Sequence, residues 1–209
     1  MRFIRRNMQI EDKYTRLCST PSDINEHLPI LKKYAEECES IIELGVRGVI
    51  STYALIYGLL NNGKKTKQIL LNDIAPCDID ELLSITNNLP IEINYKWVND
   101  LELEIKENVD LTFIDTWHVY GHLKRELNKF SKVTNRYIIL HDTTVDEWQG
   151  ETIRNGWNAK QQSKETGIPI DEINTGLWPA IEEFLLKNKD WQIKERFVNN
   201  NGLTVLQKQ

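Results

Sequence analysis

The feature that most constrains this chain is a series of short apolar stretches that alternate with segments of helical pattern. Stretches of this length, separated by helical segments, are typical of βαβ units and predict a parallel sheet that is buried on both faces. The sequence therefore predicts an α/β fold with helices on both sides of the sheet. The predicted strands are residues 40–44, 68–72, 91–98, 110–114 and 137–140, and the helices between them are 50–60, 78–87 and 120–132.

Polar residues stand where each of these predicted strands ends. Right-handed crossovers bring the carboxyl ends of parallel strands to one edge of the sheet, and ligands of such sheets bind outside that edge. The sequence therefore predicts a ligand site there. The residues at the strand ends are the Gly45–Gly48 loop, Asp73, Asn99 with Asp100, Asp115, and His141 with Asp142.

The first part of the chain gives weaker signals. Residues 1–21 mix charged and apolar side chains without a clear period, and we expect an N-terminal arm that could help to build a homodimer. Ser22 and Asp23 have the chemistry of helix caps, and Pro29 indicates a break or a fresh first helical turn.

The second half of the chain interrupts the alternating pattern. Residues 143–176 form a long polar stretch, which in a compact domain is typical of a lid or of an acceptor-binding segment. A helix is then expected over 177–188, and a hairpin of strands 191–198 and 203–207 turns at 199–202. We expect residues 1–209 to form a single domain.

Composition narrows the class of protein. The chain has 26 Lys and Arg against 31 Asp and Glu, a net charge of −5, which argues against a general binder of nucleic acid. No apolar run approaches the length of a membrane span, and we expect no secretory signal. Cys18, Cys38 and Cys77 are odd in number and far apart, which indicates reduced thiols. We expect a cytoplasmic protein, or one of the host cytoplasm if the source is a virus, with no membrane or nucleic-acid partner.

The loop after the first predicted strand is the clearest binding motif. Glycines let the backbone approach a ligand, and the helix that follows offers free amides. Only Gly45 and Gly48 are present, one fewer than the dinucleotide fingerprint needs. Glu43 would repel a pyrophosphate but suits a ligand with an ammonium or sulfonium group. The alternative is that the two glycines only make a tight turn.

Further strand ends suit a nucleoside. Asp73 is placed to accept hydrogen bonds from a ribose diol, and Asn99 or Asp100 could face an adenine amino group. The predicted cofactor-binding residues are therefore Glu43, Gly45, Val46, Gly48, Ser51, Asp73, Asn99, Asp100 and Asp115.

Several motifs together resemble the class I S-adenosylmethionine-dependent methyltransferases. IIELGVRG is similar to their first motif and LLND to their acidic end of the second strand. FIDTWHVYGHLKREL, YIILHDT, GLWPAIEEF and NNNGLTVL are similar to the branch that includes proteins named cephalosporin hydroxylase and the O-methyltransferases of macrolide and rhamnosyl sugars. The resemblance spans about residue 20 to the C-terminus. It implies a Rossmann-like αβα sandwich, a mostly parallel seven-stranded sheet that ends in an antiparallel hairpin, and methyl transfer, often with a divalent metal.

The resemblance also points to residues for the acceptor. In metal-dependent relatives, acids at the ends of the fourth and fifth strands bind Mg²⁺, which implies Asp115 and Asp142 here. Relatives often carry a second acid where this chain has His141, and imidazole suits transition metals better than Mg²⁺. Three options follow: Mg²⁺ with fewer protein ligands, a softer divalent ion that His141 could also bind, or no metal with His141 as the base. His118 matches the D-x-x-H position and is the other candidate base, the alternative being a structural histidine.

The long polar segment carries aromatic residues that suit a sugar. Trp148 and Trp157, with Trp178 just after, could stack on a sugar ring or could pack the segment onto the core. The leading hypothesis is an S-adenosylmethionine-dependent O-methyltransferase that methylates a hydroxyl of a small polar acceptor, with a sugar or glycoconjugate favoured. An oxidoreductase with a nucleotide cofactor on a similar fold, and a non-catalytic binding protein that kept the fold, are the alternatives.

Overall fold

The computed structural model describes residues 2–209, with side chains from Met8 onward. It contains one seven-stranded sheet with the strand order β3-β2-β1-β4-β5-β7-β6. The chain divides into two compact units, the first ending at Ile114 and the second spanning Asp115–Gln209. The fold class and the C-terminal antiparallel hairpin that the sequence predicts are confirmed.

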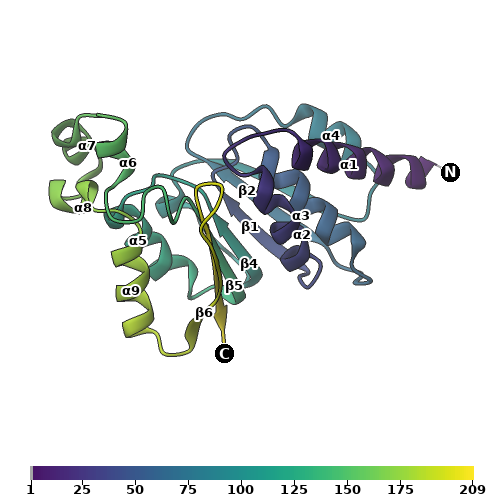
Figure 1. The fold of residues 1–209 in the computed structure, drawn as a ribbon. Helices are drawn as coiled ribbons and strands as arrows, with labels where there is room; N and C mark the ends of the chain where they lie inside the picture. The colour runs from purple at the N-terminus through teal and green to yellow at the C-terminus, as the bar shows by residue number, and fades with distance from the viewer. Residues whose placement is uncertain (1) are drawn as a thin grey trace. The chain divides into compact units, whose positions relative to one another are not determined.

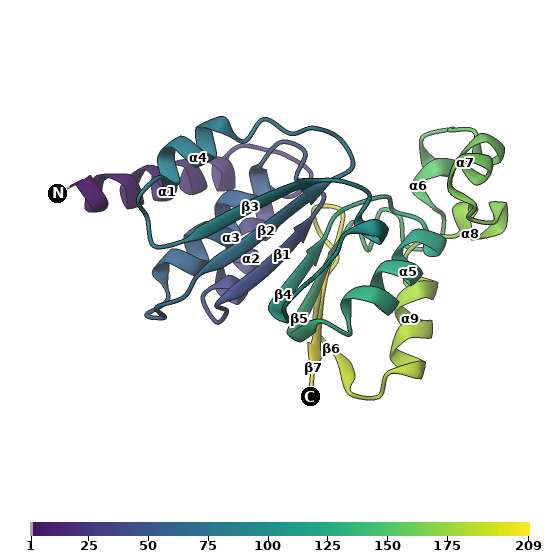
Figure 2. The same ribbon diagram turned by 180° about the vertical axis from the view of Figure 1, so that it is seen from behind.

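The first unit supplies four parallel strands. β1 pairs with β2 and with β4, and β2 pairs with β3. Every residue of β1 is buried, as a central strand covered on both faces requires. Helices α2 and α3 lie side by side against the strands (Figures 1 and 2). The elements are α1 (Arg2–Ser19), η1 (Asn25–His27), α2 (Leu28–Ala35), β1 (Ser40–Leu44), α3 (Ile50–Asn61), β2 (Gln68–Asp73), α4 (Asp80–Thr86), β3 (Glu92–Trp97), η2 (Asp100–Glu102) and β4 (Val109–Ile114).

The start of the chain, where the sequence predicts an arm, is helical, and its role in a homodimer stays a prediction. α1 packs against α3 and α4. Ile10 is fully buried, and the ring of Tyr14 lies 5.0 Å from that of Tyr57. Ile10, Tyr14 and Leu17 recur at helical spacing on this covered side, a periodic pattern that the sequence interpretation missed. Residue 1 lies outside the described residues.

The predicted cap at Ser22 and Asp23 is also corrected. The Ser22 hydroxyl accepts the amide of Ile24 at 3.3 Å, within a turn before η1. α2 begins later, after His27, which makes no capping hydrogen bond through its side chain. Pro29 lies in the first turn of α2, where its missing amide costs nothing, as the sequence indicates.

The second unit combines an antiparallel arrangement of strands with helices. β7 pairs antiparallel with both β5 and β6. Helices α5 and α9 pack against each other (Figure 1). The elements are α5 (Tyr120–Phe130), β5 (Thr134–His141), α6 (Glu151–Arg154), α7 (Ala159–Thr166), α8 (Ile170–Asn174), α9 (Trp178–Lys187), β6 (Trp191–Phe197) and β7 (Leu203–Lys208).

The long polar segment 143–176 is more ordered than a simple loop. It contains α6, α7 and α8, which form a small lobe (Figure 2). Ile168 and Ile173 are buried with Val119 in a core of their own. An isolated bridge between Gln149 and Thr175 closes the two ends of the excursion. The segment is therefore a structured insertion.

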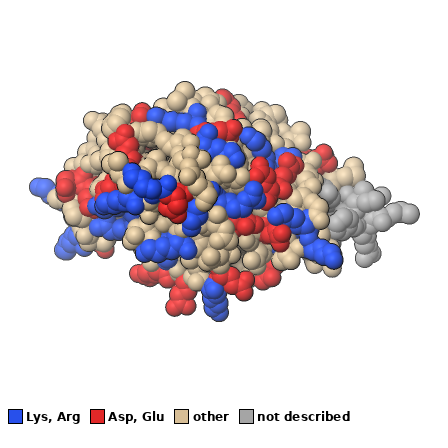
Figure 3. All heavy atoms as spheres, turned by 90° about the horizontal axis from the view of Figure 1, so that it is seen from below, with Lys and Arg blue, Asp and Glu red and all other residues tan. Residues whose placement is uncertain are grey.

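The surface charges, the helices and the cysteines of the described residues can be compared with what the composition predicts. Lys and Arg side chains intermingle with Asp and Glu among the residues coloured in Figure 3. Among the described helices, none combines the length and the apolarity that crossing a bilayer requires. The three cysteines are free thiols.

Candidate functional site

The loop between β1 and α3 has an unusual backbone. Gly45, Arg47 and Val49 all have positive φ angles, of 87°, 39° and 62°. The Gly45 amide donates to the carbonyl of Asn72 at 2.9 Å, which ties the loop to the end of β2. Left-handed residues other than glycine are uncommon and gather at functional sites, where the surrounding structure holds them.

Asp73, at the end of β2, holds this loop in place. One carboxylate oxygen accepts the amides of Val46 and Arg47, each at 2.9 Å, and the other accepts the amide of Ala75 at 2.8 Å. Burial acts to raise the pKa of Asp73, but the three backbone donors outweigh it and hold the pKa below its usual value. The carboxylate predicted to face a ribose therefore also sets the shape of the glycine loop.

The two glycines of the loop differ in what the fold requires of them. Gly45 adopts a φ angle of 87°, which favours glycine. The φ angle of Gly48 is not in the left-handed region, so its backbone conformation does not require glycine. A Cβ at this position would lie 3.8 Å from Ile50 Cγ1, an ordinary contact. The tight turn explains Gly45 but not Gly48, which leaves close approach of a ligand as a reason for a glycine at position 48.

Glu43 and Ser51 come together behind the loop. Glu43 is fully buried in β1, and the hydroxyl of Ser51, from the first turn of α3, donates to its Oε1 atom. A buried carboxylate is costly without polar partners, and this hydrogen bond supplies one. The structure thus joins two of the predicted cofactor residues.

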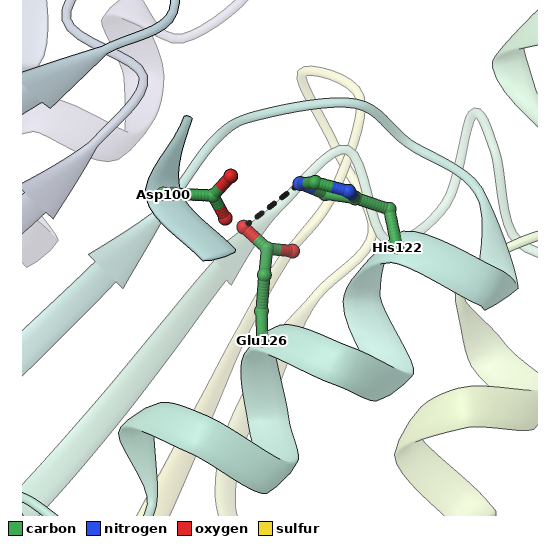
Figure 4. Close-up of side chains that lie close together, drawn as sticks. All are labelled: Asp100, His122 and Glu126. Atoms are coloured by element: carbon green, nitrogen blue, oxygen red, sulfur yellow. Dashed lines mark ion pairs between the residues drawn. The ribbon is translucent and has the colours of Figure 1, made fainter. Parts of the chain in front are cut away.

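The end of β3 carries Asn99 and Asp100. The side-chain oxygen of Asn99 accepts the amide of Leu101 at 2.9 Å and so begins η2. Asp100, drawn in Figure 4, is buried. Asn99 therefore caps η2, and a contact of either residue with an adenine stays a prediction.

Three residues beside Asp73 were not predicted. Asn72 is buried, and its amide group donates to the carbonyls of Lys96 and Val98, which joins the ends of β2 and β3. Ile74 and Trp97 are 71% and 64% exposed, and the Trp97 indole donates to the carbonyl of Ile74 at 2.8 Å. Apolar residues among the polar residues at two strand ends are the sequence signal that could have identified this surface.

The second unit places His118 among carboxylates. Its Nε2 atom lies 3.1 Å from Asp115 Oδ1, and its Nδ1 atom lies 2.9 Å from Asp142 Oδ2. The same Nδ1 atom is 3.3 Å from Asp146 and 3.6 Å from Glu151. Asp115, His118 and Asp142, all predicted to be catalytic, therefore form one cluster.

Asp146 and Arg154 support this cluster, and sequence reasoning missed Asp146. It is fully buried and accepts two hydrogen bonds from the Arg154 guanidinium, at 2.7 and 2.8 Å. Its amide donates to the carbonyl of Asp142, and the amide of Glu151 donates to the carbonyl of His118. The sequence signal for Asp146 was its position four residues after Asp142. In the structure Asp142 has a φ angle of 57°.

His141 lies beside the cluster and is less accessible. Its Nδ1 atom is 3.5 Å from Asp115 and 3.4 Å from Asp142, and its side chain is 1% exposed against 11% for His118. Of the two histidines predicted as candidate bases, His118 is the one more open to an acceptor.

Charge pairing dominates the cluster. Burial lowers the pKa of both histidines, but the carboxylates outweigh it: Asp115, Asp142 and Asp146 raise the pKa of His118 well above its usual value, and Asp115 and Asp142 raise that of His141. Burial would raise the pKa of Asp115 and of Asp146, yet His118 and His141 hold the pKa of Asp115, and His118 and Arg154 that of Asp146, below their usual values. The cluster is therefore a network of mutually stabilised charges.

The donor set bears on the divalent metal that the sequence resemblance implies. One ligand atom from each of Asp115, His118 and Asp142 lies within 4.8 Å of the others. Two carboxylates and an imidazole suit a transition-type divalent ion better than Mg²⁺, which prefers oxygen ligands alone. The residues fit such an ion, with His118 rather than His141 as the third ligand.

A second buried pair lies on α5. His122 and Glu126 lie one helical turn apart on α5, and His122 Nε2 is 3.7 Å from Glu126 Oε1 (Figure 4). The hydroxyl of Thr116 donates to the same Glu126 oxygen at 2.7 Å. Both side chains are buried, which fits a packing role for His122.

The two tryptophans of the long segment differ from Trp178, which follows it at the start of α9. Trp148 and Trp157 are 59% and 48% exposed, so they do not plug the segment onto a core. Trp178 is covered by the guanidinium of Arg196, 3.6 Å from the ring centre. Trp178 therefore has a packing role, and the first two tryptophans present aromatic faces.

Comparison with known proteins identifies the fold. No model of a known protein family matches the sequence, and no curated protein matches it. Among solved structures, an O-methyltransferase from Bacillus cereus in complex with SAH is 16% identical, with a TM-score of 0.60 over 98% of this chain and 91% of that one. The O-methyltransferase TomG from Streptomyces achromogenes, in complex with SAM, is 11% identical, with a TM-score of 0.59 over 97% and 89%.

A third structure shows the breadth of this likeness. The N-methyltransferase NodS from Bradyrhizobium japonicum, in complex with S-adenosyl-L-homocysteine, is 13% identical, with a TM-score of 0.56 over 97% of this chain and 98% of that one. O- and N-methyltransferases thus share the architecture. The chain has the class I methyltransferase fold.

Proposed function

We propose that this protein is an S-adenosylmethionine-dependent O-methyltransferase that methylates a hydroxyl group of a small polar acceptor, with a sugar or glycoconjugate favoured. One observation carries the proposal. The chain shares its fold with methyltransferases solved with SAM or SAH. In its own loop after β1, three residues have positive φ angles, and Asp73 accepts two of the loop amides. Such a loop offers a backbone surface for the cofactor.

The residues of the second unit suit the acceptor chemistry. Methyl transfer from a sulfonium is an in-line displacement that needs an aligned acceptor oxygen, and a hydroxyl is a poor nucleophile until its proton leaves. Asp115, His118 and Asp142 would hold a divalent ion, which when bound lowers the pKa of a coordinated hydroxyl. Asp146 and Glu151 orient His118, as outer carboxylates commonly orient a ligating histidine.

The cofactor is tested by isothermal titration with S-adenosylmethionine and S-adenosylhomocysteine. We expect saturable binding of both, and the absence of binding at millimolar ligand would refute the proposal. Gly48→Ala is the sharp variant, because the fold accepts its Cβ while a ligand against the loop does not. Gly63→Ala is the matched control, since a Cβ there meets nothing within 4 Å.

The metal is tested by titrating Zn²⁺, Mn²⁺ and Mg²⁺ into protein treated with chelator. We expect Zn²⁺ or Mn²⁺ to bind more tightly than Mg²⁺, because one ligand is an imidazole. Asp142→Asn should abolish this binding, and Asp190→Asn, which changes an exposed acid elsewhere in the second unit, should not. Absence of binding by all three ions would instead favour His118 as a base paired with Asp115.

The acceptor class rests on Trp148 and Trp157. Their exposed aromatic faces, close in sequence to Glu151 and Arg154, suit a ring with an apolar face and many hydroxyl groups. Transfer of a labelled methyl group from S-adenosylmethionine to a panel of sugars and glycosides tests the class. Transfer to catechols with none to sugars would overturn it.

A further inference from the structure

The segment between β4 and α5 supplies two members of the charged cluster. Asp115 and His118 stand three positions apart in it, and His118 Nε2 lies 3.1 Å from Asp115 Oδ1. Neither residue belongs to a strand or a helix, because β4 ends at Ile114 and α5 begins at Tyr120. The hydrogen bonds of regular secondary structure therefore do not fix these two residues, and their side chains depend on other contacts of the segment.

The two residues between them contact α5. The hydroxyl of Thr116 donates to Glu126 Oε1 at 2.7 Å. The ring of Trp117 lies 6.0 Å from that of His122, tilted by 50°. His122 and Glu126 share one face of the helix, since they are four residues apart. The segment thus presents its outer pair of side chains to the cluster and its inner pair to this face of α5.

The contact between Thr116 and Glu126 is suited to hold the segment. Glu126 is 1% exposed, and a polar atom in so buried a place is costly to leave without its hydrogen bond. α5, which carries Glu126, packs against α8 and α9 and so gives a fixed anchor. Threonine is β-branched and stiff at its first side-chain torsion, so a hydroxyl that is held in place also holds the backbone that carries it.

We propose that Glu126 is a positioning residue of the acceptor site, which acts through Thr116 on residues 115–118. It keeps Asp115 and His118 in the arrangement that holds a divalent ion. This inference rests on the proposed function and adds a support for the site that comes from α5. Such a support matters for methyl transfer, because a displacement of about 1 Å at a reacting group can lower a rate by about a hundredfold.

This support differs from that of Asp146 and Glu151. Those two carboxylates approach Nδ1 of the His118 ring from the chain after β5, at 3.3 and 3.6 Å. Glu126 instead acts through the residues that precede His118 in the chain. The cluster is therefore held from two directions, and the two supports can be tested apart.

The experiment compares Thr116→Val, which removes the hydroxyl and keeps the shape of the side chain, with Thr116→Ser, which keeps the hydroxyl. Thr134→Val is the matched control. The Thr134 hydroxyl also donates a hydrogen bond of 2.7 Å, to the carbonyl of Phe130, but at the opposite end of β5 from His141. The first readout is the nitrogen chemical shifts of the His118 ring in metal-free protein, assigned by their loss in His118→Gln. The second is the affinity for Zn²⁺ and for Mn²⁺ by isothermal titration.

We expect Thr116→Val to shift the His118 ring signals and to weaken binding of the ions by about tenfold or more, the usual loss when a group behind a metal ligand is removed. Thr116→Ser and Thr134→Val should leave both readouts close to those of wild type. In a Glu126→Leu protein, Thr116→Val should add no further change, because the contact is already lost. If Glu126→Leu does not fold, the two Thr116 variants decide the question alone.

Two results would overturn the inference. One is a loss of stability in Thr116→Val equal to that in Thr134→Val, with ring signals and ion affinities unchanged, which would leave Glu126 a packing residue. The other is an equal change in Thr116→Val and Thr116→Ser, since the hydroxyl would then not be the cause. A wild-type protein that binds neither ion would refute the metal proposal, and the ring signals would still test the inference. Failure to bind S-adenosylmethionine would refute the cofactor proposal and would alter neither readout.

Discussion

The two units of this protein hold their acidic residues in different ways. In the first unit, backbone amides of the glycine loop and of Ala75 hold the carboxylate of Asp73. In the second unit, the side-chain cations of His118 and Arg154 hold Asp146. Backbone donors cannot be lost by titration or by substitution of a side chain. The first arrangement is therefore a property of the loop, and the second depends on every member of a charged network.

This difference predicts which unit is more sensitive to a single substitution. Removing one partner of a buried charge network leaves the others uncompensated in a poorly solvated place. Removing a carboxylate held by amides leaves neutral donors, which water can satisfy where the site is half-buried. We therefore expect the largest losses of stability in the second unit.

Asp146→Asn should have the largest effect. The substitution keeps the size of a fully buried side chain but leaves His118 and Arg154 without its charge. We expect the free energy of unfolding to fall by about 3 kcal/mol, as for other broken buried pairs. Denaturant unfolding measures it, with Asp190→Asn as the exposed control. A loss below about 1 kcal/mol, typical of a surface change, would show that the network is not energetically coupled.

Gly202→Ala tests the turn that packs against the end of β5. Gly202 has a φ angle of 97°, and a Cβ there would lie 2.5 Å from the amide nitrogen of Thr144. That amide is itself fixed by donation to Asn201 at 2.9 Å, so the backbone cannot yield easily. We expect a loss of about 2 kcal/mol from strain at a left-handed position together with the clash. Gly167→Ala separates the two causes, because its φ angle of 73° is also left-handed but its Cβ would meet nothing. Equal losses in the two variants would assign the effect to φ alone.

Asp73→Asn should lower the free energy of unfolding by less, about 1 kcal/mol. The amide side chain keeps one oxygen that can accept a hydrogen bond from the loop. The sign of its pH dependence follows from the lowered pKa of Asp73. A carboxylate whose pKa is lower when folded stabilises the fold above its ordinary pKa, and that stabilisation is lost as the pH falls. The difference in unfolding free energy between wild type and variant should therefore narrow below about pH 4. A difference that is constant from neutral pH downward would show that the charge of Asp73 is not what holds the loop.

The sequence predicts which residues stand at the two sites better than it predicts the side chains that surround them. Strands and strand ends follow from local runs of apolar residues, so the amino-acid pattern alone places Asp73, Asp115 and Asp142 at strand ends. It does not place Asp146, because the role of that residue depends on a turn at Asp142 and on Arg154 from α6.

The same limit applies to elements without a broad apolar face. The helices of segment 143–176 bury few side chains. Their helical state is settled by contacts with other elements, which a periodic pattern does not record. The Ser22–Asp23 cap was wrong for a related reason, since those polar groups are used within a turn before the helix begins.

Arg47→Ala should have the smallest effect on stability, within about 0.5 kcal/mol of wild type, because its partner, Asp23, is an exposed acid and surface ion pairs contribute little. Thermal and denaturant unfolding measure this, with Lys65→Ala, an exposed change of charge elsewhere in the first unit, as the control. Arg47 lies in the loop whose shape Asp73 sets through the backbone. A loop held by backbone donors should tolerate the loss of this side chain, and its conformation should survive in the variant. A loss of several kcal/mol would mean that side-chain pairing, as in the second unit, also holds the first, and the contrast between the two units would fail.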